Sequence, residues 1–218
     1  MTPAAIATAI KRGAAQLPQE ITDTAADKLA LLLLELQRWN ARFNLTAIRD
    51  LPGMISGHVL DSLTARPLLK GTRILDVGTG AGFPGLPLAI VDPELEITLL
   101  DSNGKKIRFV QHVIGELGLG NASTVHSRVE RYAPEERFDT VIARAFAPLP
   151  RMLAQTGHLI AETGMLLALK GKYPAAELAE LGEAAETWKA DVSKLKVPGL
   201  DQHERHAICL TRQPEVRA

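Results

Sequence analysis

The chain has 218 residues, in which 25 Lys and Arg side chains balance 25 Asp and Glu side chains. Hydrophobic residues make up 46% and charged residues 23%, the composition of an ordinary soluble globular protein with one sizeable core. The zero formal net charge excludes a strongly basic nucleic-acid coat, so any nucleic-acid contact has to come from a local patch.

Cysteine usage and the N-terminal sequence bear on location. Cys209 is the only cysteine, which excludes an internal disulfide and a thiolate metal cluster, and no metal is expected. No apolar run approaches the length of a membrane span. Lys11 and Arg12 follow the first alanine-rich stretch rather than precede it, which does not fit a signal peptide. We expect a cytoplasmic protein with no membrane or disulfide-linked partner.

The first third of the chain predicts helices. Residues 22–43 place Trp39 and several leucines at helical spacing, with charged residues on the opposite side. Weaker patterns predict helices over residues 3–16 and 52–69. We expect residues 1–70 to form an N-terminal helical region packed on a core formed by residues 71–218.

From Gly71 onward, strand and helix patterns alternate, which is typical of an α/β protein with a parallel sheet. Strands are expected near 73–77, 95–100, 122–126, 138–143, 164–169, 187–196 and 204–211. Helices are expected near 84–91, 104–118, 148–160 and 174–184. A turn at 197–201 joins the last two strands directly. The predicted fold is therefore Rossmann-like, with a seven-stranded, mostly parallel sheet whose last strand is antiparallel.

The stretch from Ile74 to Gly85 is the most informative in the chain. A buried strand ends at Asp76 and Val77, and glycines follow at the alternate positions 78, 80 and 82. Gly78, Gly80 and Gly82 turn the chain tightly and let its backbone approach a ligand. We expect Asp76 to be a fixed acceptor or negative charge beside that ligand.

Two classes of cofactor have to be weighed against this motif. Gly80, Gly82 and Gly85 fit the G-x-G-x-x-G spacing of dinucleotide enzymes, which hold a pyrophosphate on backbone amides. An acid at the strand end is unfavourable beside a pyrophosphate, but it suits an ammonium group. S-adenosylmethionine carries an ammonium and a sulfonium and no phosphate. Asp76 therefore favours a methyltransferase whose cofactor is S-adenosyl-L-methionine and whose product is S-adenosyl-L-homocysteine.

Further site residues are expected where the next strands end. Asp101 follows the glycine loop by about 20 residues, where an acid binds ribose hydroxyls; it also suits capping of the next helix. Val129 and Glu130 follow the third strand, where an adenine would lie, although Glu130 also suits a helix surface. Because the carboxyl ends of parallel strands share one edge, these segments should converge on one site.

Several short segments together resemble the bacterial 16S ribosomal RNA guanine-N7 methyltransferase family, also named glucose-inhibited division protein B. The segments are Trp39–Thr46, His58–Ser62, Asp76–Gly85, Leu99–Ser102, Lys105–Phe109, Ser127–Glu130, Ala143–Phe146, Ala168–Gly171 and Glu204–His206. The resemblance runs from about residue 35 to the final strand. Very many methyltransferases share the glycine motif, whereas the N-L-T, H-x-x-D-S and R-A-F elements together are far more specific.

The resemblance implies methylation of N7 of guanine 527 in 16S rRNA of the small ribosomal subunit. It places donor-binding positions on Gly78, Phe83, Val129, Glu130 and Arg144. With the motif acids and glycines, the full cofactor-binding set is Asp76, Gly78, Gly80, Gly82, Phe83, Asp101, Ser102, Val129, Glu130 and Arg144. RNA contacts are expected from Arg42, Lys105, Lys106, Arg108, Arg144, Lys170 and Lys172.

The chemistry of an N7 acceptor agrees with the residues present. Guanine N7 has a free lone pair, so no general base and no catalytic residue of that kind is expected. The chain reads Ala143-Arg144-Ala145-Phe146 where enzymes acting on exocyclic amines carry an N/D-P-P-aromatic motif. Arg144 suits the cofactor carboxylate, guanine O6, a phosphate or a structural ion pair, and the sequence does not choose among them.

Two other functions remain open at this point. The first is a methyltransferase acting on a small metabolite, with the N-terminal helices as a closing lid. The second is a non-catalytic ribosome-binding module that retains an old cofactor pocket. Methyl transfer to small ribosomal subunits would distinguish all three.

Overall fold

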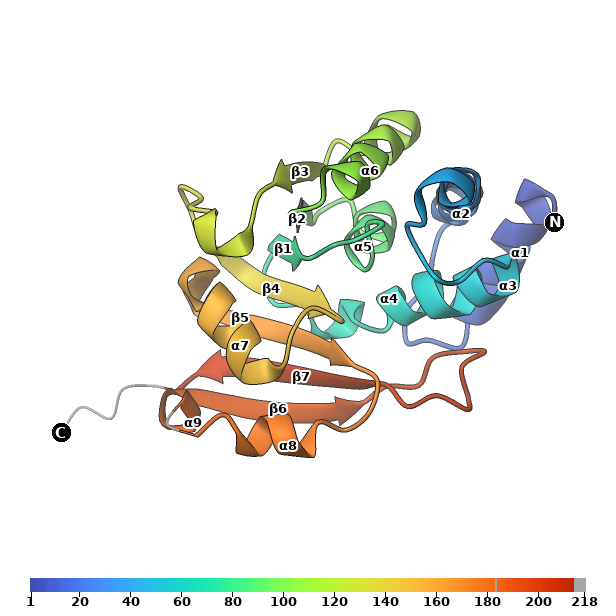
Figure 1. The fold of residues 1–218 in the computed structure, drawn as a ribbon. Coiled ribbons are helices and arrows are strands. Elements are labelled where there is room, and N and C mark those ends of the chain that lie inside the picture. Colours follow the sequence, from blue (N-terminus) through green and yellow to red (C-terminus); the bar gives the residue numbers. More distant parts are fainter. Residues whose placement is uncertain (183, 214–218) are drawn as a thin grey trace.

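A seven-stranded sheet forms the centre of the computed structural model, which describes residues 1–182 and 184–213 (Figure 1). Its strands are β1 (Arg73–Val77), β2 (Glu96–Asp101), β3 (Ala122–His126), β4 (Phe138–Arg144), β5 (Ile160–Lys170), β6 (Trp188–Lys194) and β7 (His206–Arg212). Their order is β3-β2-β1-β4-β5-β7-β6. The first five strands pair in parallel, and β7 runs antiparallel to both β5 and β6. The predicted sheet, including its antiparallel last strand, is confirmed.

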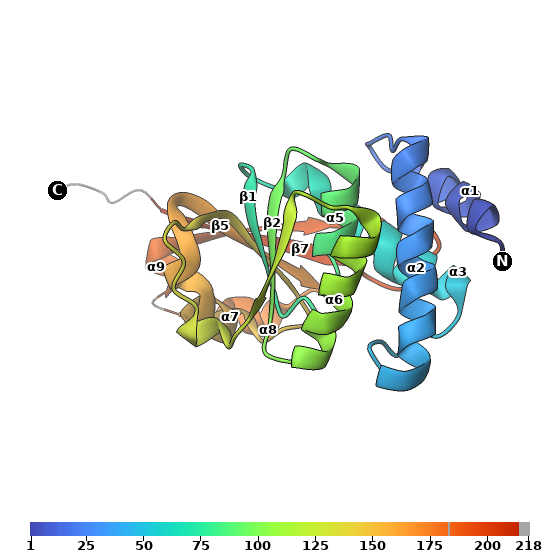
Figure 2. The same ribbon diagram turned by 90° about the horizontal axis from the view of Figure 1, so that it is seen from above.

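Alternate residues of the central strands enter two separate cores, one on each face of the sheet. Ile74 belongs to the core beneath α5 (Gly85–Val91) and α6 (Gly104–Leu117). Leu75 belongs to the opposite core, with α7 (Leu149–Thr156). The short helices α8 (Ala175–Ala179) and α9 (Ala184–Thr187) lie on the same side as α7 (Figure 2). They replace the single helix predicted over 174–184.

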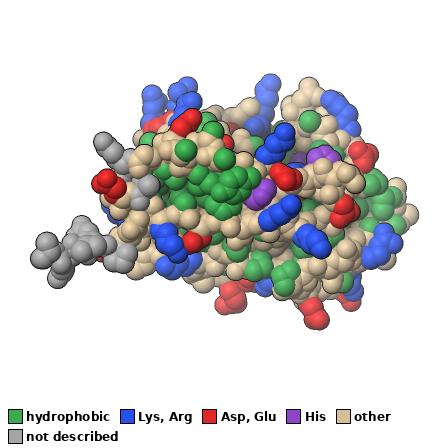
Figure 3. Space-filling view, turned by 90° about the horizontal axis from the view of Figure 1, so that it is seen from below, with side chains coloured by type: hydrophobic (Ala, Val, Ile, Leu, Met, Phe, Trp, Pro, Cys, Tyr) green, Lys and Arg blue, Asp and Glu red, His purple; other side chains and the backbone are tan. Residues whose placement is uncertain are grey.

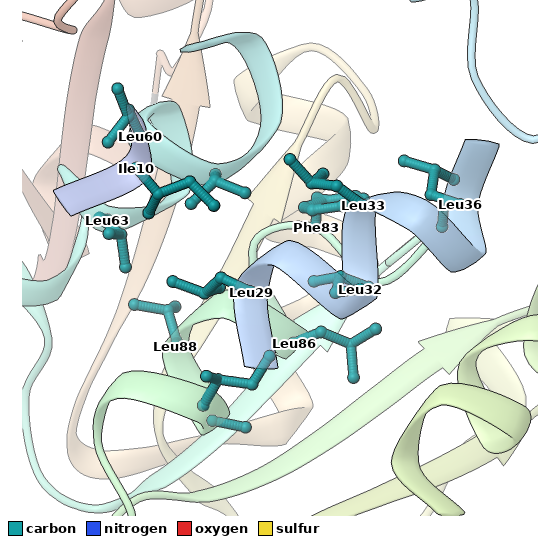
Figure 4. Close-up of a cluster of buried hydrophobic side chains, with 14 of the residues drawn as sticks. Ile10, Leu29, Leu32, Leu33, Leu36, Leu60, Leu63, Phe83, Leu86 and Leu88 are labelled. Carbon is teal, nitrogen blue, oxygen red and sulfur yellow. The ribbon is translucent and has the colours of Figure 1, made fainter. Parts of the chain in front are cut away.

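The N-terminal helices share the first of these cores. α1 (Pro3–Ala14) and α2 (Asp23–Phe43) lie beyond α5 and α6 (Figure 2). Ile10 and the α2 leucines meet Leu86 of α5 and Phe83 of the preceding loop in one buried cluster (Figure 4). Thr22 caps α2 through its hydroxyl, which accepts a hydrogen bond from the Ala25 N–H at 3.1 Å. The glycine loop and the N-terminal helices are therefore packed as one body. The division of the chain near residue 70 stays a prediction.

The helix predicted over residues 52–69 is irregular. It consists of α3 (Leu51–Met54), a π-helix η1 (Ile55–Leu60), α4 (Asp61–Leu63) and a 3-10 turn η2 (Arg66–Leu68). At the end of η1, the Asp61 N–H bonds to the Ser56 carbonyl, five residues back. π-turns of this kind are frequent at functional sites, because they redirect side chains from the regular helical positions.

Candidate active site

A cleft of about 390 Å³ opens where β1, β2 and β4 end. Five of the residues predicted to bind a cofactor line it: Gly78, Asp101, Ser102, Val129 and Glu130. Lys106, predicted to contact RNA, also lines this cleft, with its Nζ 3.8 Å from Asp101 Oδ2. The loop after β4 supplies the opposite wall through Ala145, Phe146 and Ala147. The segments that the topology predicted to converge therefore do so.

The glycine loop is held against the end of β2 by backbone contacts. Gly78 and Gly80 have φ angles of 66° and 62°, in the left-handed region that favours glycine. The N–H groups of Gly78 and Thr79 both donate to the Leu100 carbonyl, at 2.8 and 3.0 Å. The Gly80 N–H donates to Asp101 Oδ2 at 3.0 Å. Asp101 thus fixes the glycine loop from the second strand as well as lining the cleft.

Asp76 lies beneath the glycine loop and is fully buried. Its Oδ2 accepts hydrogen bonds from the Thr79 hydroxyl at 2.6 Å and from the Gly85 N–H at 2.8 Å. Its Oδ1 is buried and has no hydrogen-bond partner among the described residues. Burial raises the pKa of Asp76 to about 6, against the lowering effect of those two hydrogen bonds. Asp76 therefore organises the turn through one oxygen and leaves its other, buried oxygen without a hydrogen-bond partner among the described residues.

This raised pKa predicts an unusual dependence of stability on pH. Between the ordinary pKa of 3.8 and about 6, the folded protein holds a proton on Asp76 that the unfolded chain has lost. The free energy of unfolding should therefore decrease as pH rises through this window, by about 3 kcal/mol in total. Urea unfolding of the wild type and of Asp76→Asn across the window measures the difference. Parallel pH profiles for the two proteins would show that Asp76 titrates normally.

Phe83 does not line this cleft but supports the residues beside it. Its side chain is buried and stacks on the His58 ring, with centroids 4.6 Å apart and an interplanar angle of 18°. The guanidinium of Arg144 lies 5.8 Å from the centroid of the same ring. Phe83 is thus a packing platform that links the glycine loop to η1 and to the end of β4.

Arg144 is held by three groups of the irregular helix. Its Nη1 donates to the Gly57 carbonyl at 3.0 Å and to Asp61 Oδ2 at 2.9 Å. Its Nη2 lies 3.3 Å from His58 Nδ1. Burial and the Arg144 charge lower the pKa of His58 to about 4, so the neutral ring accepts this hydrogen bond at neutral pH. The π-turn brings these three acceptors to one guanidinium.

The N-L-T element, residues 44–46, follows α2 and helps to position His58, which contacts Arg144. The buried Asn40 side chain bonds to both the N–H and the carbonyl of Thr46, at 2.9 and 3.0 Å. The Thr46 hydroxyl lies 2.8 Å from His58 Nε2. Asn40 and Thr46 therefore fix the His58 ring, although neither residue was predicted as part of the site. Thr46 belongs to the N-L-T element, and Asn40 lies four residues before that element in the Trp39–Thr46 segment, which was the available signal.

Arg205 is a further residue that was not predicted as part of the site. Its Nε donates to Asp61 Oδ1 at 3.0 Å, so one buried carboxylate bridges Arg205 and Arg144. Arg205 directly precedes β7, and its carbonyl accepts a hydrogen bond from the Leu195 N–H at 2.8 Å. Only the tertiary fold brings positions 61 and 205 together.

Lys170 is engaged by the protein itself. Its Nζ donates to the Ala147 carbonyl at 2.8 Å and to Glu177 Oε2 at 2.7 Å, and its side chain is only 13% exposed. The same Glu177 oxygen accepts the Leu149 N–H at 2.7 Å. Lys170 and Glu177 therefore clamp the loop that forms one wall of the cleft. This placement leaves Lys170 less available to RNA than the sequence suggested.

The remaining basic residues predicted to contact RNA are exposed. Lys105 and Arg108 line a shallow groove along α6, Lys172 follows β5, and Arg42 lies in the last turn of α2. On the face seen in Figure 3, Lys and Arg side chains are interspersed with Asp and Glu around a hydrophobic patch. That face therefore carries mixed charge rather than one continuous basic field.

Within the part of the chain that the structure describes, no helix is long and apolar enough to span a membrane.

Known proteins with similar sequences identify the family. A family model described as rRNA small subunit methyltransferase G matches residues 25–208. The Ribosomal RNA small subunit methyltransferase G of Chromobacterium violaceum is 45% identical over 205 residues, covering 94% of this chain and 97% of its own length. The protein of the same name from Aeromonas salmonicida is 49% identical over 188 residues, with coverage of 86% and 89%.

Solved structures agree on the fold. The crystal structure of a SAM dependent methyltransferase from Aquifex aeolicus superposes with a TM-score of 0.57 at 18% identity, covering 73% of this chain and 93% of that one. Sequence and architecture together confirm the resemblance: this chain belongs to the rRNA small subunit methyltransferase G family.

Proposed function

We propose that this protein methylates N7 of guanine 527 in 16S rRNA of the small ribosomal subunit, with S-adenosylmethionine as the donor, in the cytoplasm. The observation that carries the proposal is the cleft at the carboxyl ends of β1, β2 and β4, in a chain of this family. The relatives named above are ribosomal RNA methyltransferases. Ala145 lines this cleft and also lines the neighbouring pocket that contains Arg144.

The residues of the cleft fit this donor. Asp101 lines the cleft and suits the donor's ribose hydroxyls. Asp76 does not line the cleft, but its unpaired Oδ1, buried beneath the glycine loop, supplies an acceptor and negative charge that suit the donor's ammonium group. Val129 and Glu130 line the part of the cleft beside β3, where the adenine would lie. When bound, the donor supplies a methyl group on a positively charged sulfur. The product of its reaction is S-adenosylhomocysteine.

The protein's own contribution is alignment. Guanine N7 carries a lone pair and no proton at neutral pH, so no side chain has to remove a proton before attack. Holding two reactants in line and excluding water lowers a barrier by roughly 7–11 kcal/mol. The rigid glycine loop and the clamped loop after β4 are suited to this task, because both are fixed by hydrogen bonds on two sides.

Transfer of a radiolabelled methyl group tests the proposal. Small ribosomal subunits from cells that lack this modification are incubated with the labelled donor, and the modified base is then mapped. Label at N7 of guanine 527 is the expected result. Label on a different nucleotide would contradict the proposed position. Binding of subunits without transfer would favour the ribosome-binding module, and transfer only to small molecules would favour the metabolite enzyme.

The Lys170–Glu177 clamp gives a separate prediction about donor affinity. Lys170→Met removes the hydrogen bond to the Ala147 carbonyl, which should loosen the cleft wall and weaken S-adenosylhomocysteine binding about 5-fold. Isothermal titration calorimetry measures this. Lys189→Met is the control, because Lys189 forms an exposed ion pair with Asp191 on β6. Equal affinities for the two variants would show that the clamp does not shape the cleft.

A further inference from the structure

A second pocket, of about 400 Å³, lies beside the donor cleft. It is lined by η1, the ends of β4 and β5, and the segment before β7, and Ala145 lines both pockets. Its charged lining residues include Asp61, Arg144 and Arg205. From the sequence, Asp61 suits either a buried polar pair with His58 or a substrate contact, and neither Asp61 nor Arg205 has a role in donor binding.

The pocket is rich in hydrogen-bond donors. A guanidinium has five N–H groups. Arg144 uses three of them, on Gly57, His58 and Asp61, and so keeps two. Arg205 uses two, on Asp61 and on the Glu204 carbonyl, and keeps three. Among the described residues, none of these remaining groups has a hydrogen-bond partner.

The charges of the cluster point the same way. Asp61 neutralises one arginine and binds the other, so the three side chains carry one net positive charge. Each Asp61 oxygen already accepts from an arginine, and its side chain is only 5% exposed. Asp61 is therefore occupied in spacing the two guanidiniums. A ligand of this pocket has to bring acceptor atoms or negative charge.

We propose that this pocket receives the target nucleotide, whose acceptor oxygens bind the guanidiniums of Arg144 and Arg205 while Asp61 holds the two apart. Two groups of one nucleotide have this chemistry: O6 of the guanine and the oxygens of the phosphate. N7 itself stays free to attack. The common boundary at Ala145 suits the requirement that the acceptor atom reach the donor's methyl group. This inference rests on the proposed function.

Arg205→Gln tests the inference. The substrate is small subunits from cells that lack the modification. The kcat/KM of the variant should fall roughly 10-fold or more, because a charge-assisted contact is lost. Its affinity for S-adenosylhomocysteine should stay unchanged. Arg66→Gln is the matched control: Arg66 pairs through Nε with Asp92 at 3.1 Å and is exposed to nearly the same extent, 28% against 26%, but it does not line the pocket. Normal methylation by Arg205→Gln would overturn the inference.

A second variant covers the case in which Arg205→Gln does not fold. Arg205→Lys keeps a positive charge beside Asp61 but loses the planar fork, so methylation should fall while the melting temperature is retained. Full activity of Arg205→Lys would leave the fork without a role and contradict the proposal. If the wild type itself does not methylate guanine N7, the proposed function fails, and the two failures are therefore distinguishable.

The salt dependence of binding distinguishes a contact to the phosphate from a contact to guanine O6. If Arg205 binds a phosphate, Arg205→Gln should reduce the slope of log binding constant against log salt by about 0.7. An unchanged slope with reduced kcat/KM assigns the contact to guanine O6. Either result supports the pocket as the site of the target nucleotide. A reduced slope together with normal kcat/KM would show only a peripheral charge effect and would contradict the assignment.

Discussion

Replacing Gly80 by valine is expected to abolish donor binding while the protein stays folded. Gly80 has a φ of 62°, which a branched residue adopts only with strain of about 1–2 kcal/mol. An added Cβ would meet no atom closer than 3.9 Å, so it would clash with nothing in the protein. It would instead lie 4.0 Å from the Nζ of Lys106, a residue that lines the donor cleft. We expect the Kd for S-adenosylhomocysteine to rise at least about 100-fold.

A second glycine separates backbone strain from loss of ligand space. Gly118 ends α6 with a φ of 57°, and an added Cβ there has no atom within 4 Å. Gly118→Val should therefore lower the melting temperature by an amount similar to Gly80→Val and leave donor affinity unchanged. Calorimetry and thermal unfolding of the two variants measure both effects. If Gly80→Val binds the product normally, the glycine loop does not approach the donor.

Replacing Asp61 by asparagine should nearly abolish methylation. Asp61 bridges Arg144 and Arg205 from a buried position, so its loss releases two guanidiniums at once. Breaking a buried ion pair on one side costs about 3 kcal/mol of stability. We expect kcat/KM for small subunits to fall at least about 100-fold, because neither arginine keeps its place.

Donor affinity distinguishes a local role in RNA methylation from a general loss of structure, because a misfolded variant would lose donor binding as well. Asp61→Asn leaves the donor cleft intact, so the variant should bind S-adenosylhomocysteine with wild-type affinity even though methylation is nearly lost. Asp92→Asn is the control, since Asp92 also pairs with an arginine but lies outside both pockets. If Asp61→Asn keeps normal turnover and merely melts earlier, Asp61 serves stability alone.

The parts of this molecule that local sequence specifies were predicted well. The strands and the convergence of Asp101, Val129 and Glu130 on one cleft follow from apolar runs, turn residues and the geometry of parallel sheets. The antiparallel last strand follows from the short turn before it. These features depend on neighbouring residues, so a single sequence contains them.

The features that were not predicted depend on partners far away in the chain. Residues 52–69 have an ordinary helical pattern, and their π-turn accompanies acceptors that converge on Arg144, more than 80 residues later. The contact between Lys170 and Glu177 was not predicted, because Glu177 belongs to a helix whose packing the sequence does not show. The fold turns the glycine loop over Asp76 and buries it, which the strand pattern alone does not show.

The insertion of β7 between β5 and β6 has a consequence for the newly made protein. While the chain emerges from the ribosome, β5 has an open edge and β6 has no neighbour to pair with, because the strand between them is synthesised last. Arg205 lies directly before that strand. All residues that line the donor cleft lie at or before position 155, whereas the pocket beside it includes Arg205 and is completed only when the final strand enters the sheet.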